Sequence, residues 1–186
     1  MIRLTGNEQF LSDDVSIGFL LSDFWSWNSS DLLNNTLRGA LAEFIVAMAL
    51  DVDTGSSRED WSSYDLLYNN YKIEIKSSAY LQSWNVDTIS KIVFGIKPTR
   101  AWSPSEGYED KIVRQSDVYI FCLFACKDRE SANPLILNQW EFYILPTRVL
   151  DEKCQNQKTI SLQSLLLLDP VKSDYINLRD SVDSLL

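Results

Sequence analysis

The hydrophobic positions of this 186-residue chain change their period from one segment to the next. Between Asp31 and Ala49, apolar residues recur at the spacing of one helix face, at Leu33, Leu37, Ala40, Leu41, Phe44 and Met48. This spacing predicts a helix over residues 31–49. The residues at positions 28–31 are Asn, Ser, Ser and Asp, whose side chains cap helix N-termini well.

Strand-like segments follow this helix. Residues 64–68 and 71–77 predict two strands, and the asparagine pair between them suits a tight hairpin turn. Residues 117–125 are almost continuously apolar, which is typical of a central strand that is buried on both faces. Residues 139–145 predict a further strand, which Pro146 stops before opening a short helix.

The remaining segments are less regular. Residues 88–94 are ambiguous between a helix end and a strand, and residues 98–110 read as a polar loop. The four leucines at 165–168 could belong to the core or to a docking surface. The length predicts a single domain over residues 1–186 with one sizeable core. The order of elements predicts an α/β (α+β) fold with a central mixed β-sheet flanked by helices, although this order is also a generic one.

Composition excludes several kinds of chemistry. The chain has no histidine, which excludes a Ser-His-Asp triad, a Cys-His pair and a His-ligated zinc site. The three cysteines cannot all pair, and no apolar run reaches transmembrane length, so we expect a reduced, cytoplasmic protein with no membrane segment. The formal net charge of −9 argues against the simplest nucleic-acid-binding surface, which is basic.

An acid, one spacer and a lysine stand near the end of the strand predicted at residues 71–77. Successive side chains of a strand point to opposite faces, so Glu74 and Lys76 share one face. A second acid, Asp65, lies a few residues upstream. Two carboxylates beside an ammonium group can hold a hard divalent cation with a water molecule next to it.

This arrangement resembles the PD-(D/E)xK nuclease superfamily, whose members have the restriction-endonuclease-like fold. Asp65 stands where the first acid of the motif belongs, and Glu74-Ile75-Lys76 matches the E-x-K element. Glu43 matches the extra acid that many members carry on the helix before the first strand. The order of these three parts along the chain is much rarer than an isolated E-x-K triplet.

The resemblance covers less than half of the chain, from residue 38 to residue 82. Gln82, six residues after Lys76, is similar to the downstream glutamine of some subfamilies. Tyr64 precedes Asp65 where the motif has proline, a departure that is frequent in the superfamily.

The resemblance implies a metal-dependent nuclease that hydrolyses the phosphodiester bonds of nucleic acid, DNA rather than RNA. Mg²⁺ or Mn²⁺ would be the cofactor, with Glu43, Asp65, Glu74 and the carbonyl oxygen of Ile75 as ligands. Lys76 would orient the attacking water or neutralise the charge that develops on the phosphate. We therefore expect the carboxyl oxygens of the three acids to converge on one cleft, with the ammonium group of Lys76 at its edge.

The roles of several nearby residues stay open. Ser77 could support the site through a hydrogen bond, and Gln82 could hold a water molecule or a phosphate. Tyr80 and Trp84 could stack on a base, although aromatic residues in such positions are more often core. The densest basic stretch could contact the phosphate backbone or belong to a solvated loop; it consists of Lys91, Lys97, Arg100, Lys111 and Arg114.

The rival function is a non-catalytic, acidic interaction module on the same fold. The net charge of −9 favours this rival, whereas the intact set of acids and lysine argues against it. A homodimer or a basic protein partner would also be compatible with the excess of acidic residues.

Overall fold

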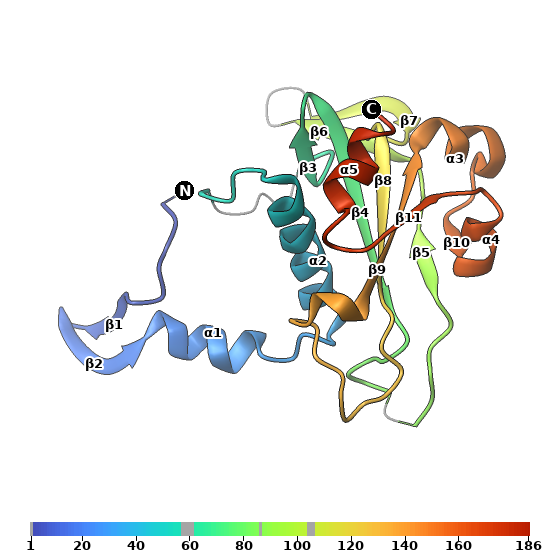
Figure 1. The fold of residues 1–186 in the computed structure, drawn as a ribbon. Coiled ribbons are helices and arrows are strands. Elements are labelled where there is room, and N and C mark those ends of the chain that lie inside the picture. The colour runs from blue at the N-terminus through green and yellow to red at the C-terminus, as the bar shows by residue number, and fades with distance from the viewer. Residues whose placement is uncertain (1, 57–61, 86, 104–106) are drawn as a thin grey trace.

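A five-stranded mixed sheet forms the centre of the computed structural model, which describes residues 2–56, 62–85, 87–103 and 107–186 (Figure 1). Its strand order is β11-β9-β8-β4-β3. The bounds are β3 (Leu66–Tyr68), β4 (Tyr71–Ala79), β8 (Val118–Phe124), β9 (Trp140–Pro146) and β11 (Val171–Ser173). Strand β4 runs parallel to β8, and the other neighbouring pairs are antiparallel. This arrangement confirms the predicted mixed sheet.

Helices cover both faces of this sheet. The helices of the described ranges are α1 (Leu21–Ser29), α2 (Asn35–Leu50), α3 (Thr147–Cys154), α4 (Leu162–Leu166) and α5 (Leu178–Asp183), and η1 (Leu137–Gln139) is a 3₁₀ turn. Helices α2 and α5 pack on one face, while α3 and α4 pack on the other. None of the helices in the described ranges is long and apolar enough to cross a membrane.

Strand β8 is the central strand, as its apolar sequence predicts. All seven of its residues are buried, and alternate side chains enter the two cores. Val118, Ile120 and Cys122 face α2 and α5, whereas Tyr119 and Phe121 face α3 and α4. The period of two therefore divides one strand between two hydrophobic clusters.

Helix α2 begins four residues later than its hydrophobic pattern predicts. The side chain of Asn34 accepts hydrogen bonds from the backbone N–H groups of Thr36 and Leu37, which makes it the N-cap. The residues before it form a turn, in which the N–H of Asn34 donates to the carbonyl oxygen of Asp31 at 3.1 Å. At the other end Asp51 adopts a left-handed conformation with φ 57° and closes the helix.

The hairpin between β3 and β4 has the predicted turn. Asn69 and Asn70 have φ angles of 49° and 68°, the left-handed conformation that asparagine tolerates better than most residues. Strand β3 is shorter than predicted, because it begins at Leu66 and not at Tyr64. Asp65 therefore lies immediately before the strand, in irregular backbone.

The prediction of a loop over residues 98–110 is wrong. Strands β6 (Thr99–Ser103) and β7 (Gly107–Val113) form an antiparallel hairpin apart from the main sheet, while residues 104–106 lie outside the described part of the chain. Asp110, Lys111 and Ile112 are all exposed, so this hairpin lacks the polar–apolar alternation that marks a half-buried strand. The ambiguous segment 88–94 ends in a short strand, β5 (Val93–Gly95), which pairs with β10 (Thr159–Ser161).

The N-terminal segment forms elements that the sequence pattern did not predict. Strands β1 (Gln9–Ser12) and β2 (Val15–Leu20) pair as a hairpin, and α1 follows directly. These three elements extend to one side of the sheet (Figure 1), and α1 has no buried residue. At the other end of the chain Leu165 is fully buried whereas Leu167 is 86 % exposed, so the leucine run contributes to the core only in part.

Truncation of the central strand should destabilise the protein strongly. Ile120→Ala removes a fully buried side chain between two helices and the sheet, and should lower the free energy of unfolding by about 2–5 kcal/mol. Ile112→Ala on β7 is the matched control, because that side chain is 59 % exposed; its effect should stay within about 0.5 kcal/mol. Urea unfolding followed by circular dichroism measures both, and equal effects would contradict the assignment of β8 as the central strand.

Candidate functional site

The candidate site lies where one edge of β4 loses its strand partner. Strand β3 pairs with β4 only as far as Ile73, and no other strand in the described ranges continues along that edge. Asp65 occupies the next position. Its backbone N–H donates to the carbonyl oxygen of Ile73 at 3.0 Å, and its Oδ2 accepts from the N–H of Ile75 at 2.6 Å. Both hydrogen bonds hold the carboxylate of Asp65 against β4.

Glu74 and Lys76 lie on the same face of β4, as the strand period predicts. The register places Glu74 beside Tyr119 and Lys76 beside Phe121 of β8. The ammonium group of Lys76 contacts the carboxylate of Glu74 in a half-buried ion pair. The other oxygen of Glu74 accepts a hydrogen bond of 3.1 Å from the hydroxyl of Ser116, which precedes β8.

Glu43 approaches from the other side of the sheet. It lies half-buried on α2, the helix that covers the face opposite Glu74 and Lys76. Its charge nevertheless acts on both Asp65 and Lys76, raising the pKa of each. The charges of Glu43 and Glu74 thus both act on Asp65 at the open edge of β4.

The electrostatics of Asp65 reflect this crowding. Burial is the largest cause that raises its pKa, from an ordinary 3.8 to about 6, and the negative charge of Glu74 is the next. Lys76 and the hydrogen bond from Ile75 lower it only in part. Burial lowers the pKa of Lys76, but the carboxylates of Glu74 and Asp65 outweigh that effect and raise it above its ordinary value. Lys76 is therefore a cation at neutral pH.

The oxygen atoms around Asp65 have the chemistry that hard divalent cations prefer. Mg²⁺ commonly uses one or two carboxylates and completes its shell with water and substrate phosphate. Burial first and the charge of Glu74 second raise the pKa of Asp65, so a bound cation would favour its ionised form. In the described ranges, however, no three Cys, Asp or Glu side chains are grouped as a preformed ion cage. The residues fit a site with two carboxylates better than one with three.

Ser77 and Gln82 are engaged with an arginine that the sequence did not single out. Arg38 of α2 donates from Nε to the hydroxyl of Ser77 at 3.2 Å and from Nη1 to Oε1 of Gln82 at 3.1 Å. Gln82 in turn donates to the carbonyl oxygen of Ala79 at 3.0 Å. One signal could have drawn attention to Arg38: it stands four residues before Ala42, on the helix face that is buried.

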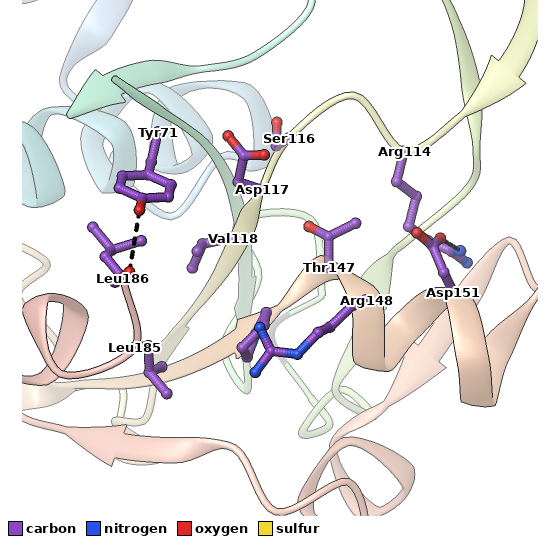
Figure 2. A pocket seen from close by; sticks show the side chains of 11 residues that line it. Tyr71, Arg114, Ser116, Asp117, Val118, Thr147, Arg148, Asp151, Leu185 and Leu186 are labelled. Atoms are coloured by element: carbon purple, nitrogen blue, oxygen red, sulfur yellow. Dashed lines mark hydrogen bonds and ion pairs between the residues drawn. The ribbon is translucent and has the colours of Figure 1, made fainter. Parts of the chain in front are cut away.

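A separate pocket of about 440 Å³ opens at the start of β4 and β8 (Figure 2). The residues that line this pocket include Ser116, which is the hydrogen-bond partner of Glu74, and the charged residues Asp117 and Arg148. The first turn of α3 forms the opposite wall, where Figure 2 shows Thr147 beside Arg148. The pocket combines acids and bases, so its charge alone does not indicate a ligand.

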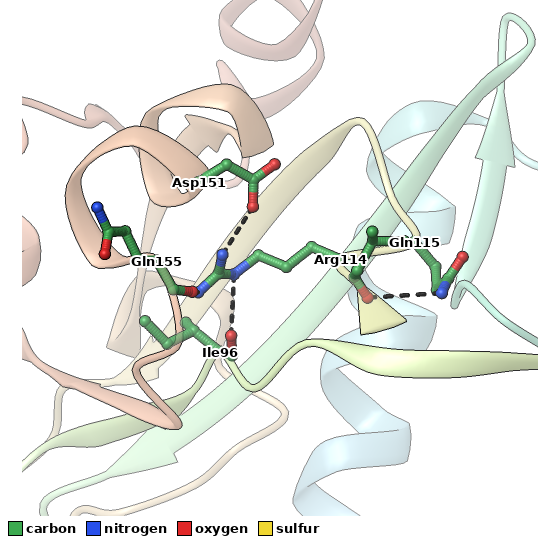
Figure 3. Close-up of polar contacts among 6 residues, drawn as sticks. Ile96, Arg114, Gln115, Asp151 and Gln155 are labelled. Carbon is green, nitrogen blue, oxygen red and sulfur yellow. Dashed lines mark hydrogen bonds and ion pairs between the residues drawn. The ribbon is translucent and has the colours of Figure 1, made fainter. Parts of the chain in front are cut away.

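Arg114 has a structural role at the border of this pocket (Figure 3). Its side chain is buried and donates to the carbonyl oxygens of Ile96 at 2.9 Å and Gln155 at 2.8 Å. It also forms an ion pair of 2.7 Å with Asp151. Arg114 thus ties β5 and α3 together, so it is neither a solvated loop residue nor free to bind phosphate. The other four residues of the predicted basic stretch are exposed.

The raised pKa of Asp65 predicts a specific dependence of stability on pH. The folded protein binds the Asp65 proton more tightly than the unfolded chain does, so ionisation weakens folding as the pH rises from 3.8 to about 6. Asp65→Asn keeps an acceptor for the N–H of Ile75 but cannot ionise. The free energy of unfolding of the wild type, minus that of the variant, should therefore fall across this range and stay constant above it. Urea titrations in metal-free buffer measure this difference. A difference that stays constant from pH 4 upward would contradict a raised pKa of Asp65 in the folded protein.

Comparison with known proteins identifies the family. Residues 18–164 match the family model described as bacteriophage T4 endonuclease IV. The matched range contains β4, β8 and every residue of the candidate site. No curated protein and no solved structure gives a significant match. Because the match spans well over half of the sequence, the chain belongs to the bacteriophage T4 endonuclease IV family.

Proposed function

We propose that this protein is a metal-dependent nuclease of the PD-(D/E)xK type that hydrolyses phosphodiester bonds in DNA. Membership of an endonuclease family supports a nuclease that acts on DNA. The observation that carries the proposal further is the carboxylate of Asp65, held at an open strand edge between two other acids and one lysine. A buried carboxylate beside a second carboxylate is an environment that suits a hard divalent cation.

Asp65 and Glu74 would hold Mg²⁺ or Mn²⁺ together with the carbonyl oxygen of Ile75, and Glu43 would add a ligand directly or through water. The metal would supply Lewis-acid activation of a phosphate oxygen and lower the pKa of a bound water molecule. The hydrogen bond from Ile75 to Asp65 keeps one carboxyl oxygen engaged, which leaves the other to face the ion. Glu74 is similarly anchored by Ser116 through one oxygen.

Lys76 would act on the reacting phosphate or on the attacking water as a fixed cation. Its raised pKa means that it does not accept a proton at neutral pH, so it is suited to orient the water and to neutralise developing charge. In the free protein its ammonium group is paired with Glu74. Glu74 would have to share its charge between the metal and Lys76, which couples metal binding to the position of the lysine.

Removal of Lys76 should separate chemistry from binding. Lys76→Ala removes the transition-state cation but leaves the carboxylates, so DNA cleavage should fall by about 10²-fold or more while metal binding persists. Lys172→Ala is the matched control. Lys172 is also a lysine on a strand, β11, and it forms an ion pair of 2.9 Å with Glu141. The control should cleave at the wild-type rate.

A time course on labelled DNA in Mg²⁺ and then in Mn²⁺ measures these rates, with circular dichroism as the check on folding. If wild type and Lys76→Ala cleave at the same low rate, the activity is a contaminant and the site is misassigned. The acidic interaction module on the same fold would then be the better account of the net charge of −9.

A divalent cation should stabilise the fold through Asp65. An ion that binds only the native state at about ten times its Kd adds about 1.4 kcal/mol to the free energy of unfolding. Asp65→Asn should abolish most of this gain, because it removes a ligand and the charge that raises the local pKa values. Thermal unfolding of both proteins with and without Mg²⁺ makes the comparison. An equal response in the two proteins would place the ion elsewhere.

A further inference from the structure

Arg38 is a buried cation without a counter-ion in the described part of the chain. Its residue is only 3 % exposed, and its guanidinium group donates to neutral acceptors alone. Beyond Ser77 and Gln82, these acceptors are the carbonyl oxygen of Leu33 at 3.0 Å and the side-chain oxygen of Asn35 at 2.8 Å. Burial lowers its pKa to about 10, so the group stays charged at neutral pH. A fixed positive charge therefore lies in a protein whose net charge is −9.

A cavity of about 410 Å³ opens in front of this guanidinium group, which we call the Arg38 pocket. Arg38, Ser77, Gln82, Trp84 and Lys91 are among its lining residues, and the described lining includes no Asp or Glu. Lys91 is exposed, and the side chain of Trp84 is 72 % exposed. Two cations, hydrogen-bonding side chains and an open indole ring thus share one hollow, a combination that suits a phosphate joined to an aromatic base.

The Arg38 pocket and the candidate active site are built on the same two elements, α2 and β4. Ser77 directly follows Lys76 on β4, and Arg38 precedes Glu43 on the same helix. Residues two apart in a strand are about 7 Å apart, so Ile75 beside Asp65 and Ser77 beside Arg38 are within reach of one bound polymer. The acids and the Arg38 pocket therefore lie near successive positions along β4.

We propose that the Arg38 pocket binds the nucleotide next to the scissile phosphate of the DNA substrate, a proposal that rests on the nuclease function above. Arg38 supplies a fixed positive potential, and Lys91 contacts the phosphate directly. Trp84 stacks on the base. This subsite would help an acidic protein to hold a polyanion, because it places positive charge beside the acids on the path of the bound strand.

The experiment measures binding separately from cleavage. Full-length protein is titrated against a short fluorescein-labelled deoxyoligonucleotide of mixed sequence in EDTA, with fluorescence anisotropy as the readout. The variants are Trp84→Ala and Lys91→Gln. The matched controls are Trp27→Ala, whose side chain is 82 % exposed on α1, and Lys158→Gln, an exposed lysine beside β10. Arg38 itself is left unchanged, because it also connects α2 to β4.

Trp84→Ala should raise the Kd roughly tenfold, the effect of losing one base-stacking contact. Lys91→Gln should raise the Kd about threefold. It should also lower the slope of log Kd against log salt concentration by about one, the contribution of one phosphate contact. Both controls should bind as the wild type does. On the same oligonucleotide with abasic sites, the Trp84 effect should disappear and the Lys91 effect should remain.

Wild-type binding by both pocket variants would overturn the proposal, as would a failure of the wild type to bind the oligonucleotide at all. An unchanged Trp84 effect on the abasic strand would overturn the stacking role. The nuclease function is judged separately: failure of the pocket would leave the cleavage defect of Lys76→Ala intact. Conversely, the wild type could fail to cleave DNA while the Trp84 and Lys91 variants bind the oligonucleotide more weakly than it does. That result would support the binding pocket and contradict the nuclease function.

Discussion

The parallel pairing of β4 with β8 is the constraint on which the rest of the structure depends. Seven consecutive residues of β4, from Ile73 to Ala79, pair in register with β8. Because strand side chains alternate, this register sends Ile73 and Ile75 into the core under α2 and α5. It places Glu74 and Lys76 on the opposite face, beside Tyr119 and Phe121. A shift by one residue would bury the charges and expose the isoleucines.

The short partner strand β3 has an equally important consequence. It leaves most of the outer edge of β4 unpaired in the described ranges, and an unpaired edge presents backbone groups that need partners. Asp65 satisfies one of these groups with its carboxylate, the hydrogen bond to Ile75. An acid is thereby held between Glu74 and the helix that carries Glu43, where burial and like charge raise its pKa. The hydrogen bond from Ile75 thus holds Asp65 close to the carboxylate of Glu74, and a bound cation would reduce the repulsion between these two groups.

Two arginines carry buried positive charge in the described part of the chain. Arg114 and Arg38 are both buried, but their surroundings differ. Arg114 pairs with Asp151 and connects β5 to α3, so its charge is neutralised inside the protein. Arg38 has only neutral acceptors in the described part of the chain, so its potential extends into the pocket beside the acids. Both arginines connect elements of the fold, but only for Arg114 do the described residues include a counter-ion.

Elements with a strong local signal were predicted well. The helix from Asn35, the asparagine turn at 69–70 and the central strand over 118–124 follow from hydrophobic period and turn chemistry. The hairpin of β6 and β7 was missed because its exposed residues carry no alternation, and the N-terminal elements were missed because they bury so little. The pairing of Glu74 with Lys76 on one face was also predictable, since it needs only the period of a strand.

The sequence by itself thus determined the types of the elements with a strong local signal, the order of the acids and lysine, and the absence of histidine chemistry. Only the tertiary structure decided that Glu43 of α2 and Glu74 of β4 both act on the pKa of Asp65. It also decided that Arg38 turns inward to Ser77 and Gln82. The physical reason is that periodicity specifies the face of a residue within its own element. Which face of another element it meets depends on long-range pairing and helix packing, and these join residues about forty positions apart.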